Sequence, residues 1–161
     1  MTFTLPSPPS VESIAGTATS LATRLGREHP AEVLIGHCID TAVFAEAAAL
    51  ALRGGSGGPD RPALLAAADA FRAVTESLDV HPDIPMPAAR ITIRGQVTSE
   101  PTAEAETALA SLAGDLLAAL AQLSDLQAGP DHVAAALRAS LHAASALAML
   151  TPAESDAGHL R

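Results

Sequence analysis

Apolar side chains recur at helical spacing along most of this chain. In residues 11–27 and 61–78 they return every three or four positions, and between 101 and 127 the spacing alternates regularly between three and four. The positions expected to face a core are Val11, Ile14, Ala18, Leu21 and Leu25, then Leu64, Ala67, Phe71, Val74 and Leu78, then Leu109, Leu112, Leu116, Ala119, Leu123 and Leu126. Each of these segments is therefore predicted to be an amphipathic helix with one buried face.

Two further segments are also predicted to be helical. Residues 31–53 are apolar on every side, which is typical of a central helix. Residues 131–150 follow a turn at Gly129 and Pro130, so this helix should run antiparallel to the one before it. Its expected core face consists of Val133, Leu137, Leu141, Ala144 and Leu147.

Helical spacing disappears between residues 79 and 99. Three prolines favour an extended backbone in 81–87, because each fixes its own φ and disfavours helix in the residue before it. In 89–98 apolar and polar side chains then alternate, which predicts a short strand. A strand needs partners for its backbone groups, and these would come from 2–5, from a small local hairpin, or from a second copy of the chain.

The same stretch is our first candidate for a partner-binding surface. An extended backbone with exposed arginines beside apolar side chains is typical of edge-strand and groove recognition. The residues expected to take part are Ile84, Arg90, Ile93 and Arg94.

The predicted fold class is therefore all-α, a bundle of about five helices with one short extended segment at 89–98. At 161 residues the chain has room for one ordinary domain, placed here at 10–151 with a glycine-rich linker at 54–59. Residues 1–9 are expected to form a loose lead, and 152–161 a frayed tail.

Composition narrows the class of protein. Hydrophobic residues make up 48% and charged residues 17%, which excludes the range typical of intrinsic disorder. The nine basic residues are all arginine, and this usage in an alanine-rich chain suggests a GC-rich bacterial gene. The net charge of −9 opposes binding to nucleic acids and to anionic membranes, and it matches a basic protein partner better.

The single cysteine and the amino terminus bear on the compartment. Cys38 has no second cysteine with which to form an intrachain disulfide, so we expect a reducing cytoplasm. Residues 1–10 lack the charged and apolar regions of a signal peptide, and no run of about 18 uninterrupted apolar residues occurs. We therefore expect a cytoplasmic chain that does not enter a membrane.

His37 and Asp40 are the metal or acid/base candidates with the most support from the sequence, and both are weak. Residues three apart share a helix face, so both side chains would reach one ion, but a site needs further ligands from other helices. The competing interpretation is a largely buried core histidine, beside Phe44 and hydrogen-bonded near Thr41. We favour that interpretation, and we predict no bound metal, no cofactor and no catalytic residue.

The sequence therefore favours a protein–protein interaction, regulatory or oligomeric scaffold module over an enzyme. The partner would be a second copy of the chain, as a two-fold homodimer, or another protein. The alternative function is a metal-dependent or acid/base enzyme around His37 and Asp40.

Overall fold

The computed structural model describes residues 13–54, 61–78, 102–126 and 129–151, and within these ranges it consists of five α-helices without a strand. The helices are α1 (Ile14–Leu25), α2 (Ala31–Arg53), α3 (Pro62–Leu78), α4 (Thr102–Asp125) and α5 (Pro130–Leu150). The predicted all-α class with five helices is confirmed. The strand predicted at 89–98 lies outside the described residues, as do both predicted termini, the core position Val11 and residues 55–59 of the predicted linker.

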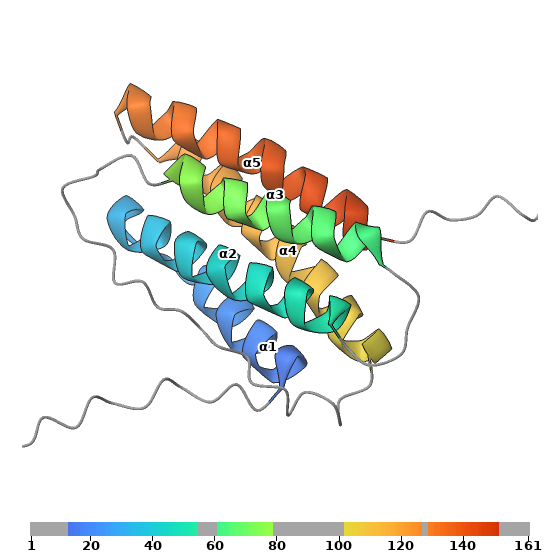
Figure 1. The fold of residues 1–161 in the computed structure, drawn as a ribbon. Helices are drawn as coiled ribbons and strands as arrows, with labels where there is room; N and C mark the ends of the chain where they lie inside the picture. Colours follow the sequence, from blue (N-terminus) through green and yellow to red (C-terminus); the bar gives the residue numbers. More distant parts are fainter. Residues whose placement is uncertain (1–12, 55–60, 79–101, 127–128, 152–161) are drawn as a thin grey trace, which may run out of the picture.

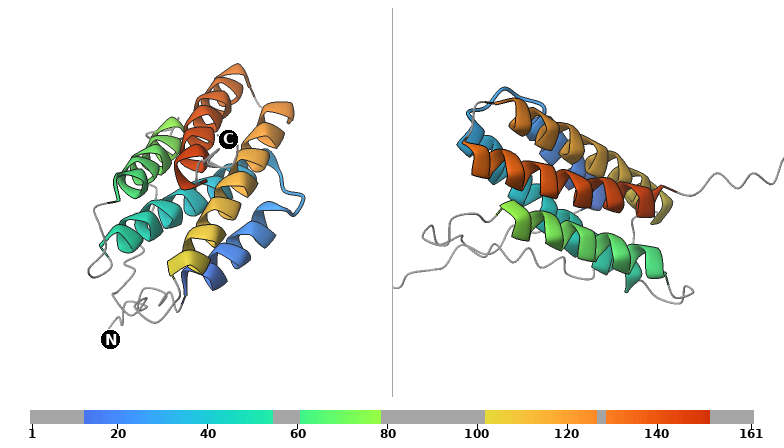
Figure 2. Two further views of the ribbon diagram at one scale, coloured as in Figure 1. Left: turned by 90° about the vertical axis from the view of Figure 1, so that its right-hand side faces the viewer. Right: turned by 90° about the horizontal axis from the view of Figure 1, so that it is seen from above.

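Four of the helices close into a ring, and the fifth packs on its side. Around the ring α2 packs against α3, α3 against α5, α5 against α4, and α4 against α2 (Figure 1). Helix α1 lies against α4 and α2, at the edge of the bundle opposite α5 (Figures 1 and 2). Helix α5 packs mainly against α3 and α4, so one side of it faces away from the bundle.

The ends of α1 and α2 are set by local chemistry. Helix α1 begins at Ile14, three residues later than the predicted segment, because Ser13 acts as its N-cap. The Ser13 hydroxyl accepts a hydrogen bond from the backbone N–H of Gly16 at 2.8 Å. Pro30 occupies the N-cap position of α2, where its missing N–H costs nothing.

The core is built from alanine and leucine around two phenylalanines. Phe44 of α2 and Phe71 of α3 are fully buried, as is Thr41, whose hydroxyl donates to the carbonyl of His37 at 2.7 Å. The predicted core positions that the structure confirms as buried are Ile14, Ala18, Leu21 and Leu25 in α1, Leu64, Ala67, Phe71, Val74 and Leu78 in α3, and Leu109, Leu112, Leu116, Ala119 and Leu123 in α4. Leu126 is only partly buried.

The predicted core face of α5 is wrong. The residues of α5 that are buried are all alanines: Ala135, Ala136, Ala139, Ala143 and Ala146. Leu137, Leu141 and Ala144 are exposed instead, and Val133 and Leu147 are partly buried. Helix α5 must pack against α3 and α4 at once, and small side chains allow two neighbouring helices to approach closely. Leu137 and Leu141 consequently point away from the bundle, whereas Leu147 packs against the core.

Two ion pairs join helices at the surface. Arg72 of α3 pairs with Glu46 of α2, where Arg72 Nε donates to Glu46 Oε1 at 2.8 Å. Arg61, just before α3, pairs with Glu106 of α4. Exposed pairs of this kind add little stability, so the buried apolar faces fix the arrangement.

Candidate functional site

The corner between α1 and α2 brings two histidines together. The ring centroids of His29 and His37 are 4.6 Å apart, with the rings tilted by 61° in an edge-to-face arrangement. His29 is held in place because its Nε2 donates a hydrogen bond to the carbonyl oxygen of Arg24 at 2.8 Å. The fold thus supplies His37 with a second imidazole, which the sequence did not predict.

The surroundings of His37 oppose its protonation. Desolvation lowers the pKa of the His37 imidazole, and the neighbouring His29 and Arg24 lower it further. Asp40, one turn along α2, acts in the opposite direction and raises it. The net direction is a pKa below the ordinary value, so this imidazole is held in its neutral form.

His37 is partly buried rather than enclosed in the core, so the expectation of a largely buried histidine is met only in part. Thr41 does form the expected local hydrogen bond, but to the backbone carbonyl of His37 rather than to the ring. Asp40 is exposed, and Cys38 faces the core, where burial raises the pKa of its thiol to about 12. Cys38 is therefore protonated and inert at neutral pH.

Taken together, these groups do not form a metal site in the part of the chain that the structure describes. No cluster of three or more His, Cys, Asp or Glu side chains is placed there to hold an ion. His29, His37 and Asp40 lie near one another at the partly exposed corner between α1 and α2, but they do not make up such a cluster.

Acidification should destabilise the protein through His37. Its folded-state pKa lies below its ordinary value of about 6.5, so between those two values the unfolded chain binds more protons. The stability linked to this group is present above about pH 6.5 and is lost as the pH falls through the folded pKa. Urea unfolding at about pH 7.5 and about pH 5 should show a smaller loss of stability in His37→Gln than in the unsubstituted chain. Equal losses in both proteins would contradict the assignment.

A second candidate site is the outward face of α5. Five apolar residues on it follow one another at alternating spacings of three and four, namely Ala134, Leu137, Leu141, Ala144 and Ala148. We call this set the α5 seam. Leu141 is 70% exposed and Leu137 is 55% exposed, and Met149 lies exposed beside the last seam residue. These leucines form a continuous stripe rather than isolated apolar side chains.

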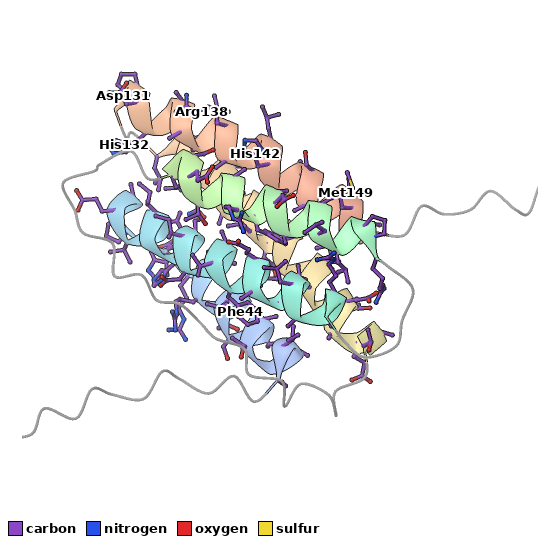
Figure 3. The ribbon with its side chains drawn as sticks, in the orientation of Figure 1. Phe44, Asp131, His132, Arg138, His142 and Met149 are labelled. Atoms are coloured by element: carbon purple, nitrogen blue, oxygen red, sulfur yellow. The ribbon has the colours of Figure 1, made fainter. Side chains whose placement is uncertain are left out.

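The α5 seam carries almost no charge. The only ionic side chains of α5 are Asp131 and Arg138, both near its amino-terminal half, and none occurs from Ala139 to Leu150. Figure 3 shows Asp131, Arg138, His142 and Met149 along the outer part of this helix. In a chain with a net charge of −9, this face is therefore a neutral apolar strip on an acidic molecule.

Large exposed apolar side chains on other described helices do not form a comparable stripe. Val33 and Leu50 of α2 are 44% and 39% exposed but lie 17 residues apart, and Leu65 of α3 is exposed next to the charged face of that helix. Scattered apolar residues of this kind are normal on a protein surface.

The partner-binding residues predicted from the sequence, Ile84, Arg90, Ile93 and Arg94, lie outside the described residues. The α5 seam, in contrast, was missed because its leucines were assigned to the core. Its signal was present in the sequence, since α5 also carries a second apolar stripe made of alanine.

Among the described helices, three are long and apolar enough to cross a membrane, judged by length and composition alone. They are α2, α4 and α5. The expectation of a chain outside the membrane rested on the lack of an uninterrupted apolar run. A helix of high mean hydropathy can nevertheless cross a membrane when it contains a few polar residues.

Comparison of the chain with protein-family models, with curated proteins and with solved structures gives no match.

Proposed function

We propose that this chain is a protein–protein interaction module that docks a helix of its partner onto the α5 seam. The observation that carries the proposal is the exposure of Leu137 and Leu141 on a helix whose alanines already fill its place in the bundle. Alanines on the inward face let α5 pack closely on α3 and α4, but that packing does not require leucines on the outward face, where they bury little surface in the isolated chain. A partner that covers these leucines recovers that free energy.

The spacing of the seam supports a helix as the docked element. Apolar residues that alternate between three and four positions follow one side of an α-helix, and this is the geometry of knobs-into-holes packing between two helices. The seam spans Ala134 to Ala148, about 21 Å at 1.5 Å per residue, which is enough for two heptads. Its lack of charge favours an apolar helix face over the basic partner suggested by net charge.

We include two further expectations in this proposal, a cytoplasmic location and a chain that lies outside the membrane. The inert, buried Cys38 agrees with a cytoplasmic location, which we retain as the proposed compartment. A bundle that buries nine of the 23 residues of α2 and eight of the 24 residues of α4 agrees with a fold completed outside the membrane.

Site-specific photo-crosslinking in cells tests the proposal. A photoreactive amino acid is placed singly at Leu137, Leu141 and Ala144, and at Ser111 and Asp115 on the exposed face of α4 as controls. We expect protein adducts from the seam positions and none from the α4 positions. Seam positions that give no protein adduct, or adducts with lipid alone, would overturn the proposed function.

A second candidate function is a metal-dependent or acid/base site at the α1–α2 corner. The specific observation that favours it is the approach of His29 to His37, with Asp40 close enough to affect the His37 pKa. Purified protein that retains stoichiometric zinc, iron or manganese, and loses it in His37→Ala and His29→Ala, would support this function. A metal-free protein would leave the interaction module as the better proposal.

A further inference from the structure

We propose that the helix docked on the α5 seam is α5 of a second copy of this chain, antiparallel and related by a two-fold axis. The inference rests on the proposed function, because it takes the seam as the docking surface, and it adds the identity of the partner and the register of the contact. Closed two-fold dimers are the commonest assemblies of identical chains.

The sizes of the seam residues match each other under this symmetry. When two α5 helices run antiparallel with Leu141 of one chain opposite Ala144 of the other, Leu137 falls opposite Ala148 of the other. Each chain then contributes two leucines, and each leucine packs over an alanine of the other chain. Leucine knobs over alanine allow the two helix axes to approach to the short end of the usual 8–10 Å range.

Other pairings of the same two helices fit less well. A parallel pair would place each leucine opposite its own copy and each alanine opposite its own copy, so two wide leucine layers would stand between narrow alanine layers and the helices would not pack evenly. The antiparallel register with Leu137 opposite Leu141 places Arg138 beside its own copy, and two like charges repel. In the proposed register Arg138 lies beside Ser145 of the other chain instead.

Charged residues outside the α5 seam affect how tightly the two chains bind. Each chain has a net charge of −9, so two copies repel each other at long range, and salt screens that repulsion. The contact itself is apolar and contains no ion pair that salt would weaken. The dimer is therefore expected to form more tightly in ~0.5 M salt than at low salt, opposite to a contact held by ion pairs.

The contact is small, so the dimer should be of modest affinity. One pair of helices about 21 Å long buries less than the roughly 800 Å² per partner of a standard interface. We expect a dissociation constant in the range of about 1–100 µM. Sedimentation equilibrium over that concentration range should show a monomer of 16.2 kDa in exchange with a species of twice that mass.

Leu141→Glu should abolish the dimer without unfolding the chain, because this side chain is 70% exposed in the monomer. The matched control is Val33→Glu, which places the same charge at an exposed apolar position of α2. We expect Leu141→Glu to remain at 16.2 kDa throughout and Val33→Glu to dimerise like the unsubstituted chain. Circular dichroism should show the same helical content in all three proteins.

Cysteine crosslinking tests the register. In the proposed register, mild oxidation of Arg138→Cys/Ser145→Cys gives a covalent dimer, whereas Arg138→Cys alone does not. The register with leucine opposite leucine predicts a covalent dimer from Arg138→Cys alone. A bridge within one chain is excluded, because residues seven apart on a helix are about 10 Å apart, beyond disulfide reach. Cys38 does not compete, since it is buried.

The outcomes separate this inference from the proposed function. An unsubstituted chain that stays monomeric at about 100 µM, or a dimer that survives Leu141→Glu, overturns the second copy as the occupant of the seam. If the photo-crosslinked adducts at Leu137 and Leu141 then contain a different protein, the proposed function stands while this inference fails. If those positions give no protein adduct, both fail.

Discussion

Replacing Phe44 with alanine is expected to lower the free energy of unfolding by about 3–5 kcal/mol. Phe44 is fully buried, and it and Phe71 are the two phenylalanines of a described core that is otherwise mostly alanine and leucine. Truncation to alanine removes most of a large side chain from a close-packed interior, so a cavity should remain. Chemical denaturation followed by circular dichroism measures the change.

The control for this substitution is Leu50→Ala, in the same helix. Leu50 is 39% exposed, so its truncation removes part of a side chain that already contacts water and should cost about 1 kcal/mol or less. A loss at Phe44 no greater than the loss at Leu50 would show that Phe44 is not packed as described. Helix α2, which contains both residues, contacts α1, α3 and α4, so a large loss at Phe44 would also confirm its central place.

Sequence patterns predicted most of the helices because each has one clear apolar face. In α3, Leu64, Phe71 and Val74 lie on the predicted side, opposite Asp69 and Arg72. Large apolar residues on one side and charges on the other leave a helix one way to pack. The same contrast holds for α1 and α4, and there the predicted core positions that the structure describes are confirmed with the single exception of Leu126.

Sequence periodicity failed to predict the buried face of α5. It has two apolar stripes, one of leucine and one of alanine, and only two ionic side chains to tell them apart. Periodicity favours the stripe with larger side chains, because it assigns burial by hydrophobicity alone. The spacing available between α3 and α4 decided the outcome instead, and such a distance depends on neighbours that a single helix sequence does not encode.

The α1–α2 corner was beyond sequence reasoning for a different reason. His29 and His37 are eight residues apart and are separated by the start of a helix, so their approach depends on the angle at which α2 leaves α1. That angle follows from the packing of both helices on α4. Sequence spacing within one helix could suggest His37 and Asp40 as a candidate pair, but it could not place the imidazole of His29 beside them.

Replacing Ala139 with leucine is the second large effect we expect, a loss of about 1–3 kcal/mol in the free energy of unfolding. Ala139 is fully buried on the inward face of α5, where the added side chain has no space unless α5 moves away from α3 and α4. Ala118→Leu, in the middle of α4 but exposed, is the matched control and should change stability by less than about 0.5 kcal/mol. Thermal and chemical unfolding of both variants give the comparison.

Ala139→Leu and Leu141→Glu together also show which face of α5 lies inside the bundle. If the leucines faced the core, as periodicity predicts, Ala139 would lie at the surface and Ala139→Leu would be nearly neutral, whereas Leu141→Glu would place an unpaired charge in the core and unfold the chain. The described fold predicts the reverse for both variants. The α5 seam is available to a partner only if the alanine face is the one that packs. A destabilised Ala139→Leu beside a folded Leu141→Glu is therefore the result that the proposed docking surface requires.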